Sequence, residues 1–182
     1  MTCLLNRTKS VLLLMVFCSL FFSLTGTHSV YAKCSESVSR PDESMEELEE
    51  VEWLIKHPPS GIIFTIREYD DEAFSWVAVR LNYYIYKLRG AHPKLSIAVL
   101  AHGDEVGSLS KASTKKYLKL HHLIQSWNKQ DVITHACGSM AHMLGLDESS
   151  FPGYIDVVPY GPSQVKDYVE LGYEHIELEL TW

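Results

Sequence analysis

From residue 60 onward, apolar positions alternate between strand-like and helix-like patterns. Continuous apolar runs at residues 61–67, 95–101, 132–136 and 155–158 predict buried strands. Apolar residues recur every three or four positions over 71–89 and 114–127, and shorter helices are predicted at 139–144 and from Gly161-Pro162 to Gly172. This alternation predicts an α/β domain over residues 60–182, with a mostly parallel sheet and helices on both faces.

The last predicted strand, residues 175–180, has a different pattern. Ile176, Leu178 and Leu180 face one way, whereas Glu177 and Glu179 face the other. A strand with one polar face is expected at the edge of a sheet, where its glutamates would discourage edge-to-edge aggregation.

Residues 33–59 are predicted to form a polar tail followed by an acidic amphipathic helix. Seven acidic residues fall within 42–52, and an apolar stripe runs through Met45, Leu48, Val51 and Ile55. The prolines at 58 and 59 end this helix. Such a helix either packs on the flank of the domain with its acidic face in solvent, or offers a docking surface to a basic partner.

Residues 1–32 have the pattern of a signal peptide. Arg7 and Lys9 precede an apolar run over 11–24, and Val30-Tyr31-Ala32 matches a cleavage site. The run is short for a bilayer span, although an uncleaved anchor is an alternative. Lys33 before Cys34 argues against a lipoprotein, and no twin arginine occurs. We therefore expect export through the general secretory route to a periplasmic location, with no membrane association after cleavage.

The charge of the mature chain excludes some partners. The leader holds two of the 16 basic residues and none of the 23 acidic ones, so the mature net charge would be −9. Nucleic acids and anionic membrane surfaces are disfavoured, because binding to them depends on Lys and Arg.

Nucleotide and flavin cofactors are also disfavoured. The loop after the first predicted strand, residues 68–72, holds four acidic residues that would repel a phosphate. No phosphate-binding glycine motif occurs in the chain. We expect no bound cofactor, and specifically no FMN, NAD or ATP.

The candidate chemistry lies at Cys137, where the third predicted strand turns into a helix. A thiol at a helix N-terminus is expected to have a lowered pKa and nucleophilic character. Gly138 permits the tight turn. His135, two residues earlier on the strand, and His102, after the neighbouring strand, are expected nearby, where a protonated imidazole would favour the thiolate. The alternative is a buried, inert cysteine beside structural histidines.

Several segments around this cysteine resemble the DsrE/DsrF-like family. They are the stretch VITHACGSMAHMLGL at 132–146, the segment FPGYIDVVP at 151–159, Gly161-Pro162-Ser163, Leu171-Gly172-Tyr173 and the loop AHGDEV at 101–106. The resemblance covers residues 61–180. It implies a flavodoxin-like three-layer fold with a five-stranded sheet, assembled into trimers, hexamers or heteromers. It also implies that Cys137 carries sulfane sulfur as a persulfide between partner proteins.

The predicted function is therefore that of a periplasmic sulfur carrier, sulfurtransferase-like rather than a turnover enzyme with a cofactor. Its donor and acceptor proteins are unidentified. His135 and His102 would tune the thiolate, and Gly138, Ser139 and the following amides would stabilise sulfur anions. A rhodanese is disfavoured because no arginine or glycine-rich six-residue loop follows the cysteine.

Two alternatives stay open at this point. Cys137, His135 and His102, with His142 as a further ligand, form a set suited to zinc or copper. A non-catalytic oligomeric protein would instead use the last strand and Trp182 for subunit contacts. Cys34 and Cys137 are read as unrelated thiols, with a disulfide between them as the alternative.

Overall fold

A computed structural model describes residues 43–180 of the chain. Five strands in this region form one parallel sheet, in the order β4-β3-β2-β1-β5. Their bounds are Gly61–Ile66 for β1, Ser96–Ala101 for β2, Val132–Cys137 for β3, Asp156–Val158 for β4 and Tyr173–Leu178 for β5. The predicted α/β class with five strands is confirmed, and every pairing is parallel. The alternating strand β5 lies at an edge, as its pattern predicts.

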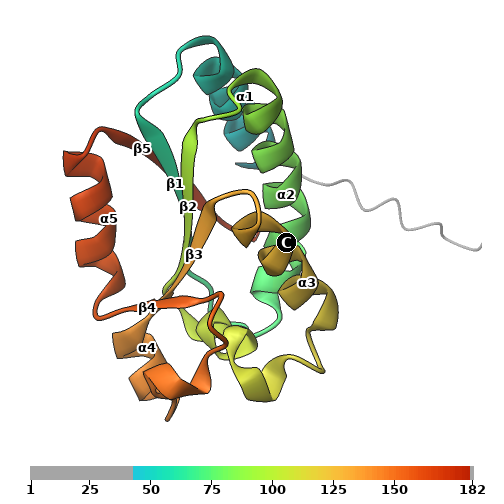
Figure 1. Ribbon diagram of the computed structural model, residues 1–182, viewed down its shortest axis with the longest axis vertical. Coiled ribbons are helices and arrows are strands. Elements are labelled where there is room, and N and C mark those ends of the chain that lie inside the picture. The colour runs from blue at the N-terminus through green and yellow to red at the C-terminus, as the bar shows by residue number, and fades with distance from the viewer. Residues whose placement is uncertain (1–42, 181–182) are drawn as a thin grey trace, which may run out of the picture. The chain divides into compact units, whose positions relative to one another are not determined.

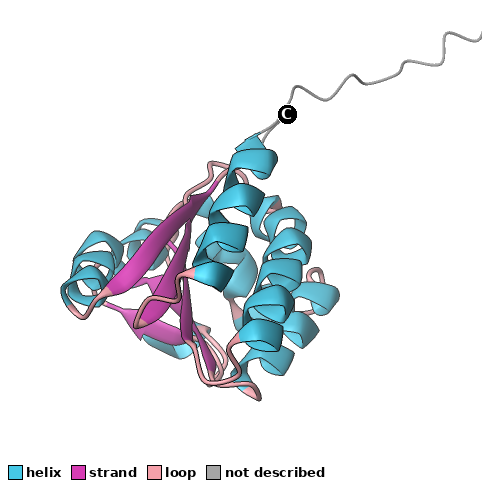
Figure 2. Cartoon of the chain, turned by 90° about the horizontal axis from the view of Figure 1, so that it is seen from above, coloured by secondary structure: helices cyan, strands magenta, loops and turns pink. Residues whose placement is uncertain are grey.

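Helices cover the sheet on both sides (Figure 1). They are α1 at Glu43–Lys56, α2 at Ala73–Ala91, α3 at Leu118–Asn128, α4 at Gly138–Met143 and α5 at Gly161–Glu170. In Figure 1, α1, α2 and α3 lie on one side of the sheet and α5 lies on the other. Figure 2 shows the strands between these helical layers. The result is a three-layer arrangement, as in flavodoxin-like folds.

The two sheet faces carry different cores because strand side chains alternate. In β1, Ile62, Phe64 and Ile66 belong to a large apolar cluster with α1, α2 and α3. Ile63 points to the opposite face, where a smaller cluster includes Leu100 and packs against α5. The strands are buried on both faces, which explains their continuous apolar runs.

The acidic helix α1 docks through most of the predicted apolar stripe, because Val51 is in the core and Leu48 and Ile55 pack against it. Val51 and Leu54 are fully buried against α2, whereas Met45 is exposed. Glu47 turns inward instead, where its carboxylate lies 3.1 Å from Nε of Arg80 and accepts a hydrogen bond from the Tyr84 hydroxyl. The docked face therefore also includes Leu54 and Glu47, and the Glu47 carboxylate is accommodated by its polar partners on α2.

One predicted helix is shorter than its periodicity suggested. Residues 104–109 and 111–113 form short 3₁₀ turns, and α3 begins only at Leu118. The Ser110 side chain accepts a hydrogen bond from the Ser113 amide and stabilises the second turn. The apolar residues before Leu118 therefore belong to turns that pack on the core.

The strand order creates a crevice beside β3. After β1 and β2 the chain passes to the side of α2 and α3. The segment after β3 joins the same core through Ala141, Phe151 and Ile155. After β4 the chain crosses instead to α5 on the opposite face. Ligands of open parallel sheets bind where neighbouring strand ends diverge in this way, so the ends of β3 and β4 mark the expected place for a site.

The predicted signal peptide, Cys34 and Trp182 lie outside the described residues. Within residues 43–180, no helix has the length and apolar character needed to cross a bilayer.

Candidate functional site

Cys137 is the last residue of β3 and the N-cap of α4, at the crevice between the ends of β3 and β4. Only 1% of its surface is exposed. It lines a cavity of about 410 Å³ together with residues from four other segments, among them Arg67, Tyr69, His102, Met140 and Tyr160. The thiol is therefore buried, but beside a space that admits a small molecule.

Two polar groups contact the sulfur. The Gly161 amide donates a hydrogen bond to Sγ over 3.2 Å, and the Ser139 hydroxyl lies 3.1 Å from Sγ. Gly161 is the first residue of α5, so this amide also carries the positive end of that helix. The sulfur therefore has a backbone donor on one side and a hydroxyl on the other.

Gly161 has no room for a side chain. A Cβ at this position would lie 2.9 Å from Cβ of His102 and 3.4 Å from Sγ of Cys137. His102 and Cys137 therefore face the same small space from neighbouring strands. Sequence reasoning placed Gly161 only at a helix start. The pairing of Cys137 with Val158 is what carries the residues after β4 to the sulfur.

His102 lines the cavity, as predicted, but in a different charge state. Burial lowers the pKa of His102; Glu177 opposes this effect, and Arg67 and His175 add to it. A neutral imidazole is therefore favoured near neutral pH, in contrast to the expected imidazolium. No hydrogen bond joins this ring to Cys137 among the described contacts.

A cation that the sequence analysis overlooked also lines the cavity. Arg67 follows β1, directly before the acidic loop 68–72. The carboxylates of that loop point to other partners: Asp71 accepts hydrogen bonds from Lys116 and Tyr117, and Glu68 accepts one from the Leu180 amide. The positive charge at this strand end could have been noticed, because parallel strand ends meet at one edge of a sheet.

A buried carboxylate holds two walls of the cavity together. Glu105, which is 0% exposed, accepts hydrogen bonds from the amides of Glu68, His102 and Gly103. Burial raises the pKa of Glu105 to about 7, although these amides oppose the shift. Gly103 has no space for a Cβ against the Glu68 backbone. The loops after β1 and β2 are thus fixed to each other.

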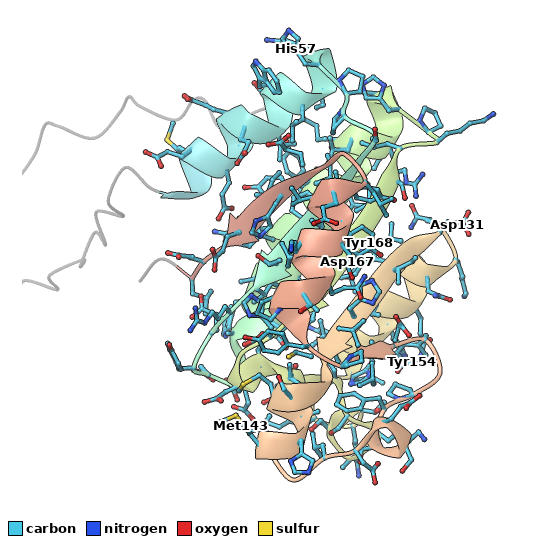
Figure 3. All side chains as sticks on the ribbon, turned by 90° about the vertical axis from the view of Figure 1, so that its left-hand side faces the viewer. His57, Asp131, Met143, Tyr154, Asp167 and Tyr168 are labelled. Atoms are coloured by element: carbon cyan, nitrogen blue, oxygen red, sulfur yellow. The ribbon has the colours of Figure 1, made fainter. Side chains whose placement is uncertain are left out.

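His135 lies on the same side of the sheet as Cys137 but outside the cavity. Its Nδ1 donates to Asp156 over 2.8 Å, and its Nε2 accepts from the Tyr168 hydroxyl over 2.8 Å. Burial lowers the pKa of His135 against the opposing effect of Asp156. Both ring nitrogens are thus occupied in fastening β3 to β4 and α5, and neither turns toward the sulfur. Figure 3 labels Tyr168 on α5 and Met143 on α4, and the two labelled residues lie apart in that view.

Gly138 and Ser139 differ in what they bring to the site. The Ser139 side chain reaches Sγ, but its amide donates to the Pro159 carbonyl and is not free for a sulfur anion. A Cβ at Gly138 would lie 2.9 Å from the Val158 carbonyl oxygen, so this glycine permits the close approach of β3 and β4. The amide that contacts sulfur comes from Gly161 rather than from α4.

Three further histidines of the described residues, His121, His122 and His142, do not line the cavity. His121 is buried and bonds the Ser108 carbonyl and the Tyr154 hydroxyl, while His122 and His142 are exposed. Across the part of the chain that the structure describes, no three His, Cys, Asp or Glu side chains are grouped to hold a metal ion.

Comparisons with known proteins support the fold. No protein-family model matches the chain, and no curated protein matches it. A protein of unknown function from Methanobacterium thermoautotrophicum, MTH1491, superposes with a TM-score of 0.54 at 20% identity, over 64% of this chain and 97% of that one. A protein of unknown function from Bacteroides thetaiotaomicron, BT1422, gives a TM-score of 0.44 at 17% identity, over 64% and 94%. The likeness to the first shows the α/β fold alone.

Proposed function

We propose that this protein is an exported sulfur carrier of the DsrE-like kind, in which Cys137 accepts sulfane sulfur and holds it as a persulfide. The observation that carries the proposal is the environment of the sulfur. It lies against a cavity of about 410 Å³, receives the Gly161 amide at 3.2 Å, and shares the cavity with Arg67. The resemblance of residues 132–163 to the DsrE/DsrF-like family supports the same chemistry.

The transfer step needs no external oxidant. With thiosulfate as the donor, the Cys137 thiolate attacks the outer sulfur, the sulfur–sulfur bond breaks, and sulfite leaves with the electron pair. An acceptor thiolate then attacks the outer sulfur of the persulfide and releases the Cys137 thiolate. The Gly161 amide and the Ser139 hydroxyl would stabilise the anionic sulfur in both steps.

Burial of the sulfur favours a small donor in the first step. At 1% exposure, Cys137 is more easily reached by a small donor such as thiosulfate or polysulfide, for which the adjoining cavity of about 410 Å³ leaves space, than by a cysteine on the surface of a folded partner. Arg67 at the cavity wall suits the negative charge of both compounds. Donor and acceptor proteins, and a periplasmic location, remain part of the proposal on the strength of the sequence.

Assembly into a homo-oligomer, a trimer or a hexamer, is proposed from the same resemblance. On α2, Trp76, Val79 and Tyr86 are all prominently exposed, and the first two line a groove shared with α3. Sedimentation equilibrium of the mature protein would show a trimer or hexamer at micromolar concentration. A monomer at that concentration would contradict this part of the proposal.

The carrier function is tested by mass spectrometry of the mature protein with Cys34→Ser, after treatment with thiosulfate or polysulfide. We expect a mass gain of one or more sulfur atoms on Cys137, removed by dithiothreitol, and none in Cys137→Ser. Absence of the gain in a folded sample, with both donors, would refute the proposal.

A further inference from the structure

Four side chains with soft or borderline donor atoms line the cavity at Cys137. They are the Cys137 thiol, the Met140 and Met143 thioethers, and the His102 imidazole. Thiolate and thioether ligands select Cu(I), and imidazole also suits copper. The two thioethers are ligands beyond the His, Cys, Asp and Glu side chains, no three of which are grouped to hold a metal among residues 43–180.

The placement of the sulfur atoms follows from helix geometry. Cys137 is the N-cap of α4, and Met140 and Met143 follow at intervals of three residues. Met140 and Met143 are neighbours on the surface of α4, whereas Cys137 precedes the helix with extended backbone. All three sulfur-bearing side chains line the cavity. Figure 3 shows Met143 at this end of the domain, away from His57 of α1.

His102 completes the set from the neighbouring strand end. The space that a Gly161 side chain would occupy is bounded by Cβ of His102 and Sγ of Cys137. His135 and His142, the other histidines considered from sequence, do not qualify, because the first has both nitrogens bonded and the second does not line the cavity. Compared with the ligand set expected from the sequence, the thioethers of Met140 and Met143 therefore take the places of the imidazoles of His135 and His142.

We propose that this cavity binds one Cu(I) ion through Cys137, Met140, Met143 and His102. Binding would release the thiol proton of Cys137, because the thiolate is the ligand. Thioethers are poor ligands for Zn²⁺, so the site would prefer Cu(I) and its close analogue Ag(I) over Zn²⁺. This inference does not rest on the sulfur-carrier function.

The test uses the anaerobic mature protein with Cys34→Ser, titrated with Cu(I) against a chromophoric chelator. We expect one Cu(I) per chain. The double variant Met140→Leu/Met143→Leu should bind at least ten-fold more weakly. Met→Leu changes conserve side-chain volume, and the fold is checked by circular dichroism. Met45→Leu is the matched control, because Met45 is 57% exposed on α1, and it should bind like the parent.

A second measurement does not depend on the variants. X-ray absorption at the copper edge of the parent protein should show at least two sulfur ligands and one nitrogen ligand. A parent that binds no Cu(I), a double variant that binds as tightly as the parent, or a single sulfur ligand would each overturn the proposal.

Persulfide formation with thiosulfate separates this inference from the carrier function. The double methionine variant should still form the persulfide on Cys137, since sulfur transfer does not require the thioethers. Loss of Cu(I) binding with persulfide formation intact supports the copper site on its own. Persulfide failure with Cu(I) binding intact would refute only the carrier.

Discussion

Two clusters of polar side chains lie two residues apart on β3 and have opposite properties. At the cavity, Cys137 has a hydrogen-bond donor, an adjacent empty space and a nearby cation. In the neighbouring cluster of Asp156, His135 and Tyr168, both ring nitrogens of the histidine are bonded. A cavity of about 460 Å³ is lined by the exposed Asp156 but by neither His135 nor Tyr168. Open space beside incompletely bonded groups distinguishes a site for chemistry from a structural contact, although the sequence presents both as polar residues near one strand end.

The largest effect is expected from breaking the structural cluster. His135→Ala would leave a buried hole and remove the hydrogen-bond partner of the Tyr168 hydroxyl, and should lower the free energy of unfolding by about 3 kcal/mol. Because His135 does not reach the cavity, alkylation of Cys137 in the folded state should change by less than about two-fold. Urea denaturation and iodoacetamide kinetics measure the two quantities.

His122→Ala is the matched control, since His122 is exposed on α3, and its stability should equal that of the parent. If His135→Ala kept the stability of the parent but slowed alkylation of Cys137, His135 would belong to the reactive site and not to a structural contact.

The next effect concerns Glu105, which fixes the cavity loops. Its folded pKa is raised to about 7. The native state therefore keeps the proton to higher pH than the unfolded chain does. The associated stability is full below the ordinary pKa of a glutamate and is lost as pH rises through about 7. A shift of this size corresponds to roughly 3 kcal/mol.

The variant Glu105→Gln cannot titrate at this position, so its comparison with the parent isolates the stability that depends on ionisation of Glu105. From pH 4.5 to pH 8, the unfolding free energy of the parent should fall relative to that of the variant by up to about 3 kcal/mol. Urea denaturation of both proteins measures this difference. A difference that stays constant over this range would show that Glu105 does not titrate there.

A smaller effect is expected from crowding the sulfur. Gly161→Ala would push the new Cβ against His102 and Cys137 and displace the amide that donates to Sγ. Loss of this hydrogen bond, together with the narrower approach to Sγ, should slow alkylation of Cys137 at pH 7 by about ten-fold. Gly153→Ala is the control, because a Cβ at Gly153 meets nothing within 4 Å. Equal alkylation rates in the parent and Gly161→Ala would show that the Gly161 amide does not influence the reactivity of Cys137.

The smallest effect concerns the charge of the cavity. Arg67→Gln should slow the reaction of Cys137 with the anion iodoacetate more than that with neutral iodoacetamide. The ratio of the two rates should fall by only about two- to five-fold, because an exposed charge interacts weakly through solvent. The parental ratio should approach that of the variant at 1 M salt. An unchanged ratio at low salt would show that Arg67 does not influence anions at the sulfur.

Much of the fold could be predicted from the sequence, because burial on both faces makes the apolar strands of a parallel sheet continuous and easy to locate. The position of Cys137 at a strand-to-helix turn followed from the same pattern. The inward position of Glu47 on α1 could not be predicted, since it depends on partners that this glutamate finds on another helix. Nor could the role of Gly161, because it depends on the pairing of β3 with β4, which brings the start of α5 to the sulfur.

The central claim is that Cys137 is a reachable thiol in the native fold despite its burial. The most direct test is the rate of iodoacetamide modification of the folded protein with Cys34→Ser, measured against reagent concentration. The account predicts complete modification at a rate proportional to reagent concentration, with no loss of the circular dichroism signal. A rate that saturates at the unfolding rate, with reaction only after denaturation, would contradict it and leave Cys137 as a structural residue.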